Sequence, residues 1–181
     1  MGEVAQERAS RGALFNSPFE AGFRAVVLLA ELHPQGADLQ RLVFFDYLLI
    51  HSGDVNGPPS LHPATPYRSQ EYTIRREVVR QGLLMMAGRG LAKIAVNPSG
   101  IEYGATVDTV PFLDRLLEPY KKALTNRAEW VVANFGSASA PELTALFSNN
   151  VGRWGSEFVF MRDFSDELAL LEAPKGNGIS S

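Results

Sequence analysis

Two short apolar segments on either side of a turn constrain the fold of this chain more than any other feature of its sequence. The segments are residues 91–96 and 101–106, and Asn-Pro-Ser-Gly at residues 97–100 joins them. Pro98 supplies the fixed φ that a type I turn favours, and Gly100 stands where the chain leaves the turn. The pattern predicts a β-hairpin.

Two helices are expected well before this hairpin. Ser17 is a good N-cap and Pro18 suits the first helical position, and the helix that they open must end before Pro34. Asp38 is the expected N-cap of the second helix, over residues 39–50. This second helix is apolar nearly all round, so we expect it to be the central helix of the core.

A third helix is expected from about residue 69 to residue 87, ending at Gly88. Tyr72, Arg76 and Arg80 lie four residues apart on its outer side. Three helices followed by a hairpin are typical of a winged helix–turn–helix domain, in which the hairpin is the wing and the third helix holds the recognition position. The predicted fold class is therefore mainly α (α+β), with a winged-helix core.

Further helices are predicted after the hairpin, over residues 109–118 and 120–135. Ser139 and Glu142 form a capping box for a short helix that reaches about Phe147. The aromatic-rich segment 154–164 is expected to be extended, and residues 166–173 to form an amphipathic helix.

These elements suggest four segments along the chain. Residues 1–14 are expected to be a flexible lead and residues 15–107 the winged-helix core. Residues 108–173 are expected to form a C-terminal helical extension, and residues 174–181 a flexible tail.

A loop rich in proline and glycine, from residue 51 to about 69, carries the one cluster that resembles a metal site. His51, Asp54 and His62 are its members, but their spacing does not match familiar zinc sites. The preferred interpretation is structural: an ordered loop packed over the second and third helices, with both histidines hydrogen-bonded to backbone and no metal. A metal hydrolase is the weaker alternative.

Six residues on or near the third helix and hairpin are candidate contacts to a partner or to DNA. Residues 68–93 hold six basic and two acidic residues, whereas the whole chain has a net charge of -3. The simpler alternative is a solvated helix face, since Glu71 and Glu77 are spaced to pair with these arginines. The candidates are Arg68, Tyr72, Arg75, Arg76, Arg80 and Lys93.

Other function classes find little support in the sequence. The chain has no cysteine, which excludes Cys nucleophiles, thiolate zinc sites and iron–sulfur clusters. It also lacks the Gly-x-Ser-x-Gly elbow and the phosphate-binding glycine loops. We therefore expect no enzyme activity and no cofactor. The polar N-terminal region and the short apolar runs predict a cytoplasmic protein without a membrane span.

Four stretches of the chain, residues 15–25, 39–54, 59–68 and 75–86, together resemble a known family. Their most distinctive parts are His-Ser-Gly-Asp at residues 51–54 and Ser-Leu-His-Pro at residues 60–63. The family is the middle component of prokaryotic ABC three-component conflict systems, the Lamassu-like antiphage operons.

The resemblance implies a non-catalytic winged-helix adaptor between two other proteins. One is a coiled-coil ABC-type ATPase that resembles the chromosome-maintenance (SMC) ATPases, and the other is an effector, often a nuclease. The family has no catalytic residues to transfer to this chain. A free-standing winged-helix transcription regulator is the alternative that the basic third helix leaves open.

Overall fold

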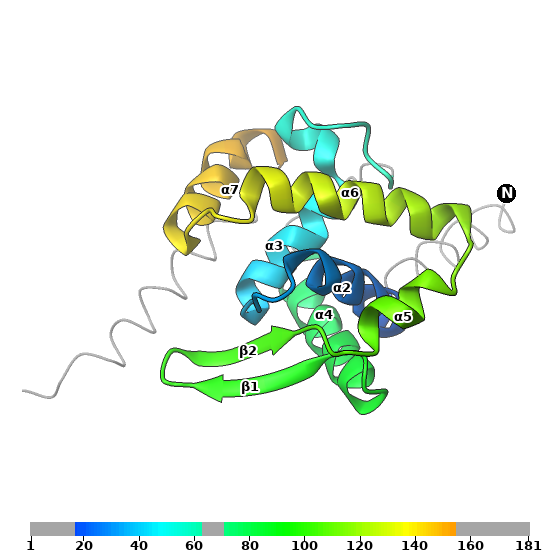
Figure 1. Ribbon diagram of the computed structural model, residues 1–181. Helices are drawn as coiled ribbons and strands as arrows, with labels where there is room; N and C mark the ends of the chain where they lie inside the picture. Colours follow the sequence, from blue (N-terminus) through cyan, green and yellow to red (C-terminus); the bar gives the residue numbers. More distant parts are fainter. Residues whose placement is uncertain (1–16, 63–70, 155–181) are drawn as a thin grey trace, which may run out of the picture.

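The computed structural model describes residues 17–62 and 71–154. Six α-helices, one 3-10 turn and a two-stranded hairpin make up this part (Figure 1). A mainly α fold with a β-hairpin is thus confirmed. In chain order the elements are α2 (Pro18–Leu32), α3 (Leu39–Ile50), η1 (Ser52–Val55), α4 (Glu71–Gly88), β1 (Lys93–Asn97), β2 (Gly100–Gly104), α5 (Thr109–Asp114), α6 (Pro119–Phe135) and α7 (Ala140–Trp154).

The first two helices begin and end as predicted. The Ser17 hydroxyl accepts a hydrogen bond from the Glu20 N–H at 3.2 Å, and the Asp38 carboxylate accepts one from the Arg41 N–H at 2.7 Å. Every residue of α3 from Leu42 onward is buried, which confirms α3 as the central core helix. It lies among α2, α4, α6 and α7.

Helices α2 and α4 touch through their backbones. A Cβ atom on Gly22 would lie 2.5 Å from the Gly82 carbonyl oxygen, and one on Gly82 would lie 2.4 Å from the Gly22 nitrogen. Only glycine at both positions allows this approach. The crossing brings Val79 and Leu83 of α4 into the common core.

The predicted hairpin is present, with strands over Lys93–Asn97 and Gly100–Gly104 rather than over residues 91–96 and 101–106. Lys93 lies opposite Gly104 and Asn97 opposite Gly100, whose φ of 123° suits glycine. Ala37, between α2 and α3, exchanges two backbone hydrogen bonds with Tyr103 at 2.8 and 2.9 Å, and this pairing attaches the hairpin to the helices.

The helices after the hairpin differ from the prediction in length. α5 ends at Asp114 rather than residue 118, since Pro119 forces Glu118 into an extended conformation. The capping box of α7 is confirmed, with the Glu142 carboxylate accepting from the Ser139 N–H at 2.7 Å. However, α7 continues past Phe147 to Trp154, and the fully buried Phe147 ring stacks on Phe44 of α3.

The expectations for residues 1–14, 155–173 and 174–181 lie outside the described residues. In the part of the chain that is described, no helix is both long and apolar enough to cross a membrane.

Candidate partner interface

The six residues predicted as partner or DNA contacts do not share one environment. Arg68 lies outside the described residues, and so does the side chain of Tyr72. Arg76 and Arg80 are exposed on α4, and Lys93 is exposed on β1. Arg75 is only 8% exposed and lies in the core instead of on the outer side of α4.

Arg75 is buried because a fully buried carboxylate, Asp46 of α3, lies opposite it. Arg75 Nη1 donates to Asp46 Oδ2 at 2.9 Å, and Arg24 Nε of α2 donates to Asp46 Oδ1 at 2.5 Å. Burial by itself would raise the pKa of Asp46, but the charges and hydrogen bonds of Arg24 and Arg75 outweigh it and hold that pKa below its usual value. The three side chains form a buried ionic bridge across three helices.

Three further groups extend this bridge into a buried polar network. Glu20 lies 3.4 Å from Arg24 Nη1, and the Tyr120 hydroxyl of α6 donates to Glu20 Oε1 at 3.0 Å. Because that donation uses the only hydroxyl hydrogen, the Tyr120 oxygen accepts from His62 Nε2, 3.0 Å away. Burial, together with the positive charge of Arg24, lowers the pKa of His62 to about 4. The buried polar network is Glu20, Arg24, Asp46, His62, Arg75 and Tyr120.

The described part of the proline-rich loop packs on α3, as predicted, where the Leu61 and His62 N–H groups donate to the Ile50 carbonyl at 3.0 and 3.1 Å, and it also packs on α6. Arg127 of α6 donates to the Ser52 hydroxyl and to two proline carbonyls, at 3.0 Å for Pro58 and 2.7 Å for Pro59. Trp130 lies over Gly57, where any Cβ would meet its ring. The prediction missed α6 because nothing local in the sequence links Arg127 to this loop.

The predicted loop cluster is split among different partners. The His62 ring is hydrogen-bonded to the Tyr120 side chain of α6 at 3.0 Å. Asp54 accepts from the Tyr47 hydroxyl at 2.5 Å, and the His51 ring packs 5.0 Å from the Tyr47 ring. Among the described residues, no three His, Cys, Asp or Glu side chains are grouped as metal ligands.

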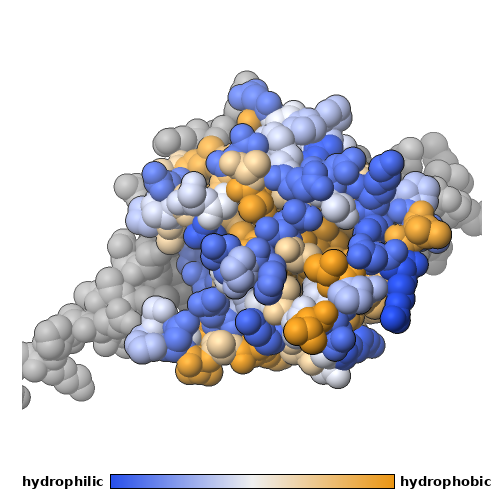
Figure 2. Space-filling view, viewed as in Figure 1, coloured by the Kyte–Doolittle hydropathy of each residue, from blue (hydrophilic) through white to orange (hydrophobic). Residues whose placement is uncertain are grey.

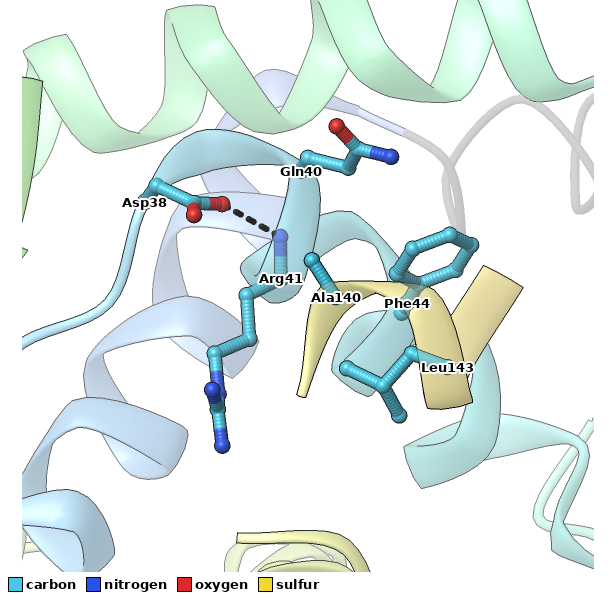
Figure 3. Close-up of a pocket in the computed structure, with 6 residues that line it drawn as sticks. All are labelled: Asp38, Gln40, Arg41, Phe44, Ala140 and Leu143. Carbon is cyan, nitrogen blue, oxygen red and sulfur yellow. Dashed lines mark hydrogen bonds between the residues drawn. The ribbon is translucent and has the colours of Figure 1, made fainter. Parts of the chain in front are cut away.

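One small hollow lies between the first turns of α3 and α7 (Figure 3). Its volume of about 20 Å³ has room for about one water molecule. The polar groups at its edge are hydrogen-bonded to backbone at helix ends. Asp38 caps the start of α3, and the Arg41 guanidinium donates to the Gly136 carbonyl that follows α6. The hollow is therefore a packing feature of the two helix starts.

Helix α4 and the hairpin carry one group of exposed apolar side chains. Cross-strand pairing puts Ile94 opposite Tyr103 and Val96 opposite Ile101, so these four side chains share one face of the hairpin. Tyr103 is only 5% exposed, whereas Val96 is 83% exposed. Figure 2 shows apolar side chains at the surface over β1. The face is covered by the helices at its base and uncovered toward its tip.

The outer side of α4 belongs to the same surface. Arg76, Arg80 and Leu84 are exposed and spaced four residues apart along it. The hydrogen bond and charge of Glu77 raise the pKa of Arg80, and Tyr103 of β2 makes a smaller contribution in the same direction. We call this set the α4–hairpin surface: Arg76, Arg80, Leu84, Ile94, Val96 and Ile101.

A second group of exposed apolar side chains lies around α5 (Figure 2). Val107, Val110 and Leu117 form it, in a stretch that also carries exposed Asp108 and Glu118. The two apolar groups thus differ in the charge beside them, which is cationic at the hairpin and acidic at α5.

The apolar members of the α4–hairpin surface were missed in the sequence. The signal was present, because Ile94 and Val96 alternate along one strand, Ile101 and Tyr103 along the other, and the four-residue turn sets their register. The buried ionic bridge could also have been inferred from the sequence. Arg24 and Asp46 are charged residues in otherwise apolar helices, and a charged side chain that is buried needs a partner of opposite charge.

Comparison with known proteins identifies a family. A family model described as ABC-three component (ABC-3C) system Middle Component 2 matches residues 14–157. No curated protein and no solved structure matches the chain. The matched range covers every described helix and strand. The chain belongs to the middle component 2 family of ABC-three-component systems.

Proposed function

We propose that this chain is a non-catalytic adaptor of a cytoplasmic, Lamassu-like antiphage complex. In it, the chain links a coiled-coil ABC-type, SMC-like ATPase to an effector such as a nuclease. Membership in a family of middle components makes it one part of a multi-subunit system. The α4–hairpin surface is the observation that carries the proposal, because it exposes both apolar side chains and arginines.

The order of elements supports a winged-helix interpretation of residues 17–104. The Ala37–Tyr103 bridge lies between the first and second helices, and the hairpin follows the third helix directly. One departure is the connection between α3 and α4, residues 51–70, where a helix–turn–helix has a turn of about 3–4 residues. The proposal therefore takes α4 as the recognition helix and the hairpin as the wing, although a long connection replaces the tight turn between α3 and α4.

A protein partner fits this surface better than duplex DNA. Affinity for DNA comes largely from cations on phosphates, but Arg75 is committed to Asp46 and Arg80 pairs with Glu77 at 2.7 Å. The hairpin face presents Ile94, Val96 and Ile101 instead of lysine or arginine. Apolar and aromatic groups with flanking arginines are the usual composition of a protein interface.

The test uses the complex assembled from this chain and the ATPase and effector encoded beside it. Replacing Arg76 and Arg80 together with alanine is expected to release the chain from the complex on size exclusion and to leave the ATPase's own DNA binding unchanged. Lys121→Ala/Lys122→Ala on α6 removes the same charge elsewhere and is the matched control.

An intact Arg76→Ala/Arg80→Ala complex would overturn the proposed interface. If its salt dependence of DNA affinity were also flatter, by about one log–log unit per lost contact, the arginines would be phosphate contacts. Sequence-specific DNA binding by the chain alone would favour the second candidate, a winged-helix regulator, which the position of α4 beside the hairpin supports.

A further inference from the structure

The apolar hairpin face carries an inference about the chain's own C-terminal region. Ile94, Val96 and Ile101 extend beyond the part of the hairpin that the helices cover. Contiguous apolar surface of this kind is usually covered in the working protein. Arg76 and Arg80 are exposed on α4, the helix that directly precedes the hairpin in the chain.

Residues 164–172 have the composition that fits this surface. Phe164, Leu168 and Leu171 follow the i, i+4, i+7 spacing of one helix face, and Asp166 and Glu167 lie between them. Residues 157–175 hold five acidic and two basic residues, a net charge of -3. An acidic amphipathic segment thus complements a surface that is apolar and borders on arginine.

The segment has enough chain to reach the hairpin. Residues 155–163 connect it to the end of α7 at Trp154. Nine residues span up to about 30 Å when extended, which is roughly the width of a small domain.

The charge beside each apolar group decides between the two possible positions for this segment. Around α5, three exposed carboxylates outnumber the one exposed arginine, Arg115, and they would repel an acidic segment; they are Asp108, Asp114 and Glu118. At the α4–hairpin surface, the exposed Arg76 would attract it, and Arg80, which already pairs with Glu77, would contribute less.

We propose that residues 164–172 dock on the α4–hairpin surface of the same molecule. The side chains of Phe164, Leu168 and Leu171 cover the hairpin face, and the acidic residues approach Arg76 and Arg80. The inference rests on the proposed function in that the segment occupies the surface assigned to the partner subunit. In the free subunit the segment thus covers the α4–hairpin surface, and the partner must displace it during assembly.

The absence of cysteine in the chain gives a clean cross-linking test in the full-length protein. Val96→Cys/Leu168→Cys places one thiol on the hairpin and one in the segment. Val107→Cys/Leu168→Cys is the matched control, because Val107 is a valine of similar exposure, 90% against 83%. Both pairs are oxidised in dilute free subunit, and disulfide formation is followed on non-reducing gels.

The Val96 pair is expected to close within one molecule at least about tenfold faster than the Val107 pair, since docking raises the effective concentration of the two thiols. Equal rates would overturn the proposal. A product that is mainly dimeric at high dilution would overturn it too, by assigning the surface to a second copy.

A second measurement avoids cysteine. In Leu168→Asp/Leu171→Asp, hydrogen exchange of the amides in β1 is expected to accelerate relative to the wild type, and unchanged exchange would contradict docking. Both measurements use the free subunit, so their failure leaves the partner interface standing. Failure of the Arg76→Ala/Arg80→Ala test, in turn, leaves intramolecular docking standing.

Discussion

Two regions of this molecule use arginines from the same helix in opposite ways. In the buried polar network, Arg75 joins α4 to Asp46 and loses its contact with water. In the α4–hairpin surface, the adjacent Arg76 remains exposed. Adjacent residues on a helix point about 100° apart. Arg75 therefore points into the core, whereas Arg76, one residue later, points to the surface and can contact a partner.

The regions also differ in how they are assembled. The buried polar network collects side chains from α2, α3, α4, α6 and the loop that follows η1. The α4–hairpin surface comes from one helix and the strands that follow it. The network is therefore expected to govern stability, and the surface to govern binding.

The largest effect is expected from Asp46→Ala, which leaves Arg24 and Arg75 buried without their carboxylate. Removing one partner of a buried ionic bridge costs about 3–5 kcal/mol, and urea unfolding measures it. The control is Asp108→Ala, since that exposed carboxylate makes no cap hydrogen bond. A cost below about 1 kcal/mol for Asp46→Ala would mean that the network does not hold the helices together.

Arg75→Ala and Arg76→Ala compare the two regions at adjacent positions. Loss of Arg75 removes a charged hydrogen bond to Asp46 and is expected to cost about 2–3 kcal/mol. Loss of Arg76 is expected to change the free energy of unfolding by less than about 0.5 kcal/mol. Equal costs in thermal or urea unfolding would erase the distinction between the two residues.

A smaller effect is expected from pH. The folded pKa of His62 is about 4, below the usual 6.5, so the unfolded chain binds the proton more readily. Stability should fall as the pH drops from 6.5 to 4, by about 1 kcal/mol, because His62 is only partly buried and solvent screens the effect. Arg24 and Arg75 disfavour the proton, and Asp46 favours it.

His62→Gln isolates this contribution and should flatten the pH dependence between 6.5 and 4. Loss of the Asp46 bridge belongs to a more acidic range, because the pKa of Asp46 lies below 3.8 in the folded state. An identical slope in wild type and His62→Gln would contradict the burial of a neutral histidine.

The smallest effect is expected from the exposed ion pair on α4. Glu77→Gln breaks the contact with Arg80, in which both side chains are about half exposed, at 44% and 50%. The free energy of unfolding should change by less than about 0.5 kcal/mol. A loss above 1 kcal/mol would place this pair with the buried network rather than with the surface.

Local features of the fold were predictable from the sequence, and long-range pairings were not. The caps at Ser17, Asp38 and Ser139 and the turn before Gly100 depend on neighbours within a few residues, and all were correctly predicted. Arg75 was placed on the surface because its partner, Asp46, is 29 residues away. The spacing of residues along a helix gives the direction in which each side chain points, but it does not give which side of the helix a neighbouring helix covers.

The most direct test of the account compares Val96→Asp with Val107→Asp in the assembled three-component complex. Both valines are largely exposed, so neither change should reduce the stability of the free subunit by more than about 0.5 kcal/mol. The account predicts that Val96→Asp releases the chain from its partner subunits on size exclusion and that Val107→Asp remains in the complex. Retention of Val96→Asp would contradict the assignment of the α4–hairpin surface as the partner interface.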